Sequence, residues 1–161
     1  MTEPGYLRLC GMVHQLEREQ TIPAAVSAVW AFFATPKNLN ALTPPSLRFQ
    51  LLGEAPPMYA GQMISYRIRV APLVRLRWLT EIVHLEPGRF FVDEQRIGPY
   101  RVWHHEHHFA EAAGGTRMVD RVTYALPLGV VGDLVHAVWV RPQLRYIFDY
   151  RAAKVREHFP D

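Results

Sequence analysis

Residues 93–109 have the sequence DEQRIGPYRVWHHEHHF, which predicts a β-hairpin rich in titratable side chains. Gly98 and Pro99 mark its turn, because glycine tolerates unusual backbone angles and proline cannot donate to a sheet ladder. Side chains of a strand alternate between two faces, so the four histidines of the second arm divide into two pairs. One pair lies between large aromatic residues, on a face made of Trp103, His105, His107 and Phe109. We expect this face to turn inward.

The opposite face of the same arm is mostly polar. His104 and His108 flank Glu106 on it, and Val102 precedes them. Histidine and glutamate side chains are usually exposed when their neighbours on the same face are polar. We therefore expect His104 and His108 to face water and assign them no role in function.

Strand-like runs separated by turn residues follow one another through most of the chain. They cover residues 12–22, 48–53, 62–70, 74–85, 89–97, 100–111 and 116–126. The connections among the last five runs are too short for the crossover of a dozen or more residues that parallel strands need. The pattern predicts an antiparallel meander.

Short helices are predicted after the first strand. Apolar side chains at three- and four-residue spacing indicate an amphipathic helix over residues 24–34. Residues 36–42 can form a second short helix with Thr35 as its cap. The segment Thr43-Pro44-Pro45 is expected to end helical structure.

A longer amphipathic pattern occupies the C-terminal region. Leu144, Phe148, Val155 and Phe159 fall on one stripe. Proline lacks the amide hydrogen of an interior helical residue, so Pro142 either starts the main helix or kinks a longer one. We predict a short leading piece and a main helix from about residue 142 to residue 158, roughly 25 Å long.

Length and composition predict one globular domain over residues 1–161. Hydrophobic residues make up 49% of the chain, aromatic residues 12% and charged residues 20%, which is typical of a folded domain. A chain of this length buries roughly two-thirds of its unfolded surface, so we expect it to fold without a cofactor or a disulfide.

Charge and cysteine content argue against several classes of protein. The net charge is +3, but the arginines are scattered rather than clustered, which argues against nucleic-acid binding. A single cysteine, Cys10, excludes an internal disulfide and favours a cytoplasmic location. The N-terminus lacks the pattern of an export signal, and no apolar run reaches the roughly 18 residues of a membrane span.

Motifs along nearly the whole chain carry a family resemblance. They include Ile22-Pro23-Ala24, Leu42-Thr43-Pro44-Pro45, Asp93-Glu94-Gln95, Gly98-Pro99-Tyr100, Gly115-Thr116 and Leu126-Pro127, with Trp30, Trp103, His105, His107, Asp120 and Phe148. In this order they resemble the START-like or Bet v 1-like (SRPBCC) superfamily, in particular its bacterial polyketide cyclase/dehydrase-like branch.

The resemblance implies an α+β helix-grip fold. In this fold a curved antiparallel sheet of about seven strands wraps around a long C-terminal helix, and two short helices follow the first strand. The resemblance also implies a mostly apolar ligand cavity between sheet and helix, a kind of pocket that typically has a volume of roughly 300–1,000 Å³.

Polar residues interrupt the apolar inner faces of the predicted strands. Asp93 and Gln95 share a face with Phe91, and Asp120 shares one with Tyr124. A buried polar group without a partner costs about 1–3 kcal/mol, so these groups should pair with one another, with water or with a ligand. We expect a ligand site made of Trp78, Asp93, Gln95, Trp103, His105, His107, Asp120, Tyr124, Arg141 and Phe148.

Two functions fit this site, and we prefer the first. It is the binding of a hydrophobic small molecule, lipid-, quinone- or polyketide-like, whose polar end the Asp, Gln and His side chains orient without a cofactor or metal. The alternative is a polyketide cyclase/aromatase or dehydratase-like enzyme that uses His105 or His107 as acid or base. No nucleophile motif accompanies the histidines, which favours binding. A zinc site of His105, His107 and Asp120 is least favoured, because no cysteine or further histidine signal supports it.

Overall fold

The computed structural model describes residues 12–54 and 56–160, so Cys10 lies outside the described residues. Seven strands form one antiparallel sheet: β1 (Val13–Ile22), β2 (Gln50–Leu52), β3 (Met63–Ala71), β4 (Val74–Glu86), β5 (Phe90–Ile97), β6 (Val102–Ala112) and β7 (Gly115–Ala125). Their spatial order is β1-β7-β6-β5-β4-β3-β2. The predicted antiparallel meander is confirmed, and β1 extends it by pairing with β7.

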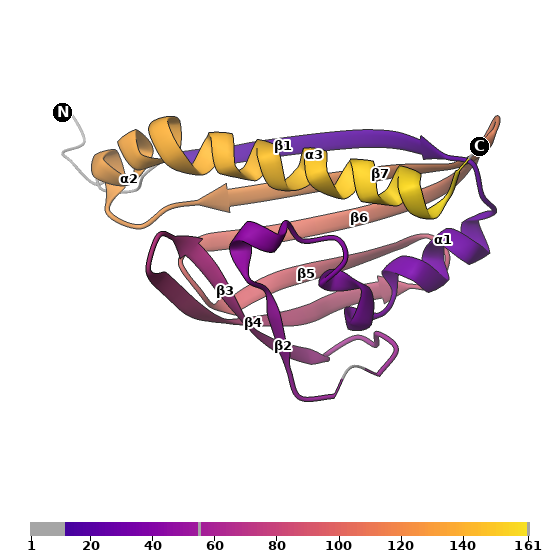
Figure 1. The fold of residues 1–161 in the computed structure, drawn as a ribbon, viewed down its shortest axis with the longest axis horizontal. Coiled ribbons are helices and arrows are strands. Elements are labelled where there is room, and N and C mark those ends of the chain that lie inside the picture. The colour runs from indigo at the N-terminus through magenta and orange to yellow at the C-terminus, as the bar shows by residue number, and fades with distance from the viewer. Residues whose placement is uncertain (1–11, 55, 161) are drawn as a thin grey trace, which may run out of the picture.

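The C-terminal helical region runs along β1 and β7 (Figure 1). It consists of α2 (Gly129–Val135), a π-helical turn (His136–Val140) and α3 (Arg141–His158), which follow one another without a break. The predicted leading piece and main helix are therefore confirmed, but they are continuous. The missing amide hydrogen of Pro142 falls in the first turn of α3, directly after the π turn, where the hydrogen-bond register changes.

Two short helices follow β1, as predicted. The first, α1 (Val26–Phe33), buries Val29 and Phe33. The second is a 3-10 helix at Pro36–Leu39, in which the Thr35 hydroxyl accepts a hydrogen bond from the Lys37 amide at 3.4 Å. A further 3-10 turn, Pro45–Leu47, lies where helical structure was expected to end. Proline is compatible with that position, because the first amides of a helix have no partner within it. Sheet, grip helix and short helices together confirm the α+β helix-grip fold.

Burial along β6 alternates as the sequence predicts. His105 and His107 are only 4% and 5% exposed, and Phe109 is buried beside them. On the opposite face, the His104 and His108 side chains are 36% and 42% exposed. The inward direction of the Trp103–Phe109 face is therefore confirmed for its two histidines.

Gly115 provides a test of how closely the start of β7 packs against the end of β1. Its φ is +136°, and an added Cβ would collide with the carbonyl oxygen of Ile22, whereas Gly114, at φ +87°, has open space around it. We expect Gly115→Ala to lower the free energy of unfolding by about 3 kcal/mol, because the backbone must move, and Gly114→Ala to lower it by only about 1 kcal/mol. Urea denaturation measures both values. Equal losses would contradict the close approach at Gly115.

Candidate functional site

A cavity of about 150 Å³ lies between the sheet and α3. Six of the ten expected site residues line it: Trp78, Asp93, Trp103, His105, His107 and Phe148. The volume is below the 300–1,000 Å³ that such pockets typically have. Aromatic side chains narrow the space, since Trp78 contacts the rings of Tyr66, Tyr100 and Trp103 at centroid distances of 5.8, 5.6 and 5.4 Å.

Gln95 lies outside the cavity lining and instead closes the turn between β5 and β6. Its side-chain amide donates a hydrogen bond to the Tyr100 carbonyl at 2.7 Å, and its side-chain oxygen accepts one from the Tyr100 amide at 3.1 Å. The pairing of β4 with β5 shifts register between Leu79 and Thr80, next to this position. The pairing from Asp93 to Gln95 is itself regular, so strand alternation holds there, and the turn rather than the cavity takes up the Gln95 side chain.

Tyr124 and Arg141 also lie outside the cavity lining. The Tyr124 hydroxyl contacts Nε2 of His136 at 2.8 Å, and His136 stacks on His14 with ring centroids 3.5 Å apart. Burial raises the pKa of Tyr124 and lowers the pKa of His136, which favours the neutral form of both groups. Arg141 is exposed at the start of α3. The sequence analysis missed the pairing of His14 with His136 because only the fold brings these distant positions together.

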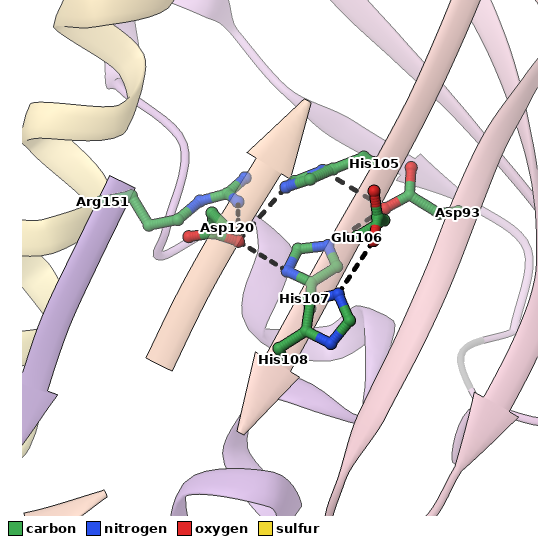
Figure 2. A network of polar contacts seen from close by, with 7 residues as sticks. All are labelled: Asp93, His105, Glu106, His107, His108, Asp120 and Arg151. Atoms are coloured by element: carbon green, nitrogen blue, oxygen red, sulfur yellow. Dashed lines mark hydrogen bonds and ion pairs between the residues drawn. The ribbon is translucent and has the colours of Figure 1, made fainter. Parts of the chain in front are cut away.

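Asp93, His105, Asp120 and His107 form a closed ring of polar contacts, which we call the Asp–His ring (Figure 2). His105 Nδ1 lies 3.3 Å from Asp93 Oδ2, and His105 Nε2 lies 3.2 Å from Asp120 Oδ1. His107 Nε2 lies 3.1 Å from Asp93 Oδ2, and His107 Nδ1 lies 2.7 Å from Asp120 Oδ1. The last contact is an ion-pair contact without hydrogen-bond geometry.

Strand register explains why these four side chains meet. Asp93 of β5 is the direct cross-strand partner of His105, and Asp120 of β7 is the direct partner of His107. Directly opposed residues on one sheet face have their Cβ atoms about 5 Å apart, within reach of an Asp–His contact. Asp120 therefore supports the histidines from the adjacent strand instead of lining the main cavity.

Arg151 is a site residue that the sequence analysis missed. Its guanidinium extends from α3 toward the Asp–His ring (Figure 2), with Nη1 3.8 Å from Asp120 Oδ1. It also lies over the Phe148 ring, 4.8 Å from the centroid, and it lines the cavity. A signal was present in the sequence, because position 151 lies between Phe148 and Val155 on the inward stripe of the helix.

The carboxyl groups and histidines of the ring stabilise each other's charged forms. Burial opposes ionisation of Asp93 and Asp120, but the charges and hydrogen bonds of the histidines lower the pKa of both carboxyls well below the usual range. Burial also opposes protonation of His105, but the charge of Asp93 and the hydrogen bond to Asp120 raise its pKa. The raised pKa favours the protonated form of His105, which lies against both carboxylates, and the Arg151 guanidinium adds a further positive charge beside Asp120.

Two cavity-lining side chains carry donors without partners. Trp78 is 6% exposed, and its Nε1 has no hydrogen-bond partner among the described residues. The same holds for Nε and Nη1 of Arg151 within the described part of the chain. A buried donor without a partner is costly, so these N–H groups are suited to an acceptor atom of a ligand.

The Asp–His ring also has the residue types of a metal site. Asp93, His105 and His107 each offer one ligand atom, and these atoms lie within 4.8 Å of one another. Two imidazoles and one carboxylate suit zinc or ferrous iron. A cation at this position would have to compete with the hydrogen bonds and ion pairs that already join the ring.

The protein has a mostly apolar cavity between its sheet and α3, with polar groups of the Asp–His ring in the wall. These features are typical of helix-grip proteins whose fold binds hydrophobic ligands. A family model described as "Polyketide cyclase / dehydrase and lipid transport" matches residues 13–159. The chain belongs to this family, as the resemblance to the SRPBCC superfamily predicted. No curated protein matches the sequence.

Several solved structures share the fold of this chain at low sequence identity. Protein CV1439 from Chromobacterium violaceum matches with a TM-score of 0.68 and 15% identity, covering 92% of this chain and 99% of that one. Ginseng major latex-like protein 151 from Panax ginseng matches with a TM-score of 0.68 and 12% identity, covering 94% and 100%. A nucleoside-diphosphate sugar epimerase from Corynebacterium glutamicum matches at 0.65 and 22%, covering 88% of this chain but 28% of that one. At these identities the likeness concerns the fold.

Within the described residues, no helix has both the length and the apolar character needed to span a bilayer.

Substitution of Asp120 tests the energetic importance of the Asp–His ring. Asp120→Asn removes the charge that faces His105, His107 and Arg151, and breaking a buried ion pair from one side costs about 3–5 kcal/mol. We expect the free energy of unfolding to fall by about that amount. The control, Glu106→Gln on the outer face of β6, should cost about 1 kcal/mol or less. Urea denaturation compares the two, and a loss as small as the control's would contradict a tightly coupled ring.

The stability that the ring provides should depend on pH in two directions. The lowered pKa values of Asp93 and Asp120 stabilise the fold above about pH 4, the ordinary carboxyl pKa, and this effect is lost as pH falls through the folded values. The raised pKa of His105 stabilises the fold fully below about pH 6.5, and this effect is lost as pH rises through the folded value. The unfolding free-energy difference between the unmodified protein and His105→Gln should therefore shrink above about pH 6.5. Urea titrations between acid and alkaline pH test this, and a difference that grows would contradict it.

Proposed function

We propose that this protein binds a lipid-, quinone- or polyketide-like small molecule in the cavity, with a polar acceptor of the ligand directed toward the Asp–His ring. One observation carries the proposal: Trp78 and Arg151, which line a mostly apolar cavity, have buried N–H groups without a hydrogen-bond partner among the described residues. Apolar burial supplies the affinity, and the placed donors supply the orientation.

The size of the cavity favours a cyclic body. A space of about 150 Å³ accommodates a single ring such as benzene. Its wall includes the aromatic rings of Tyr66, Trp78 and Trp103, which suit stacking or edge contacts with a planar ligand. A ring with a short substituent therefore fits better than a coiled alkyl chain.

The charge balance of the ring favours a neutral acceptor. His105 lies against Asp93 and Asp120, and Arg151 faces Asp120, so the basic groups that could attract an acidic ligand already have carboxylate partners. A neutral carbonyl oxygen can accept a hydrogen bond from Arg151 or from Trp78 without adding a charge to the site. Among the three ligand classes, quinone- and polyketide-like carbonyl compounds fit this condition best.

Acid–base catalysis by His105 or His107 is the second candidate, and the position of both rings at the cavity wall favours it. A general base, however, needs a free nitrogen within hydrogen-bond reach of the substrate proton. Both nitrogens of each histidine lie against carboxylate oxygens. This arrangement supports a binding role over a catalytic one.

Native mass spectrometry of the protein purified from its own host tests ligand binding directly. We expect a bound small apolar molecule, or uptake of menadione as a compact quinone probe and 2,4-dihydroxyacetophenone as a single-ring polyketide-like probe. A protein that carries no ligand and accepts neither probe would overturn the proposal.

Arg151 should determine affinity for a carbonyl ligand. Replacing it by glutamine shortens the donor and removes the charge, so we expect the Kd for menadione to rise about tenfold, which corresponds to about 1.4 kcal/mol. Tryptophan quenching measures the Kd. Arg145→Gln, on the exposed side of the same helix, is the matched control and should leave the Kd unchanged.

Trp78→Phe is a second, independent variant for the same prediction. It keeps an aromatic ring and removes only the indole N–H, so folding should be preserved while menadione binds several-fold more weakly. Unchanged binding in both Arg151→Gln and Trp78→Phe would contradict the assigned donors.

A further inference from the structure

The helical segment from Leu128 to Val140 has inverted polarity. Its inward positions are Gly132, His136 and Val140, while its outward side chains are almost entirely apolar. The exposed large side chains are Leu128, Val130, Val131, Leu134, Val135, Val138 and Trp139. A surface helix normally turns its apolar stripe inward and its polar residues outward. An outward apolar face of this size marks a contact with an apolar environment.

The turn between β3 and β4 extends this face. Gln143, one turn after Trp139, donates a hydrogen bond to the Val70 carbonyl at 3.1 Å and so ties α3 to the hairpin. Leu73, at the tip of that hairpin, is 94% exposed. The hairpin tip and α2 lie at the same end of the molecule (Figure 1, left). We call the outward side of residues 128–139, together with Leu73, the apolar end face.

Arginines border the apolar end face. Arg141 and Arg145 follow Trp139 on exposed positions of α3, and Arg75 follows Leu73 on β4. Among the ion pairs of the described residues, none involves these three arginines. Asp133 is the one acidic residue of the segment, and its side chain is mostly covered. It accepts a hydrogen bond from the Met12 amide at 3.0 Å. The border is therefore cationic.

The geometry points to a peripheral membrane-docking surface: the apolar end face inserts into the headgroup region of a bilayer that contains anionic phospholipids. Exposed Leu and Val side chains with a tryptophan and flanking arginines are the features by which helices lie in a membrane interface. The arginines pair with lipid phosphates. A second copy is a poorer occupant, because a two-fold contact through this face would bring like-charged arginine borders together.

Docking would also bring the cavity to the lipid surface. Arg69, Val70 and Gln143 line the cavity, and Val70 and Gln143 form the link between hairpin and helix beside the apolar end face. A ligand dissolved in the bilayer would then have a short path to the cavity. The docking surface itself goes beyond the proposed ligand function and does not depend on it.

Vesicle binding by the full chain tests this inference. We expect sedimentation with vesicles of phosphatidylcholine and phosphatidylglycerol, and much weaker sedimentation with phosphatidylcholine alone. Leu134→Ser combined with Val138→Ser should lower the partition coefficient about tenfold or more, and so should Arg141→Gln combined with Arg145→Gln. Met63→Ser, an exposed apolar residue at the other end of β3, is the matched control and should have no effect.

Trp139 reports the insertion directly, since it is exposed in the free protein. Brominated lipids should quench part of the tryptophan emission, and Trp139→Phe should remove that part. Three results would overturn the inference: no sedimentation with anionic vesicles, equal sedimentation of the serine double variant, or no quenching that depends on Trp139. A dimer in light scattering that the serine double variant converts to a monomer would assign the face to a second copy instead. A failure of this test leaves ligand binding untouched, because native mass spectrometry measures that function without vesicles.

Discussion

Two carboxylates buried beneath a helix must be matched by partners, and this requirement joins the sheet to its grip helix. Asp93 and Asp120 come from β5 and β7, His105 and His107 from the strand between them, and Arg151 from α3. A slip of one residue in β6 would turn its histidines to the outer face and leave both carboxylates without partners. The Asp–His ring therefore helps fix the register of three strands. Asp93, His105 and His107 of the ring then form a polar part of the wall of a mostly apolar cavity.

Strand alternation in β6 made the central part of the site predictable. Aromatic residues on the face of His105 and His107 indicated which side is buried, and short connections indicated antiparallel neighbours. Those two facts place both carboxylates on strands next to the histidines. The connection over residues 98–101 then sets the register that brings Asp93 opposite His105. The overall fold was predictable for the same reason, with the family resemblance supplying the helix that the sheet grips.

The remaining site residues depend on features that periodicity does not encode. Gln95 keeps the strand alternation of Asp93, but its side-chain amide binds the backbone of Tyr100 in the turn instead of lining the cavity. Arg151 is not predicted by an apolar periodicity, because it is a charged residue on the inward stripe of α3. A largely buried arginine on that stripe needs an acidic partner, and Asp120, which faces it, lies on another element. Arg141, which the sequence analysis placed at the ligand, lies on the exposed side of the helix start.

The spacing of inward-facing residues explains how the C-terminal helical region can both line the cavity and present apolar side chains to the outside. Inward positions recur every four residues through Gly132, His136, Val140, Leu144 and Phe148. In an α-helix, four-residue spacing drifts by about 40° per step, so this stripe would leave the sheet within a few turns. The π turn at His136–Val140 holds more residues per turn and absorbs part of that drift. The inward stripe can therefore stay in contact with the sheet along the whole helical region. It consists of Gly132 before the π turn, His136 and Val140 within it, and Leu144 and Phe148 after it. The large apolar side chains of α2 are consequently on the outside.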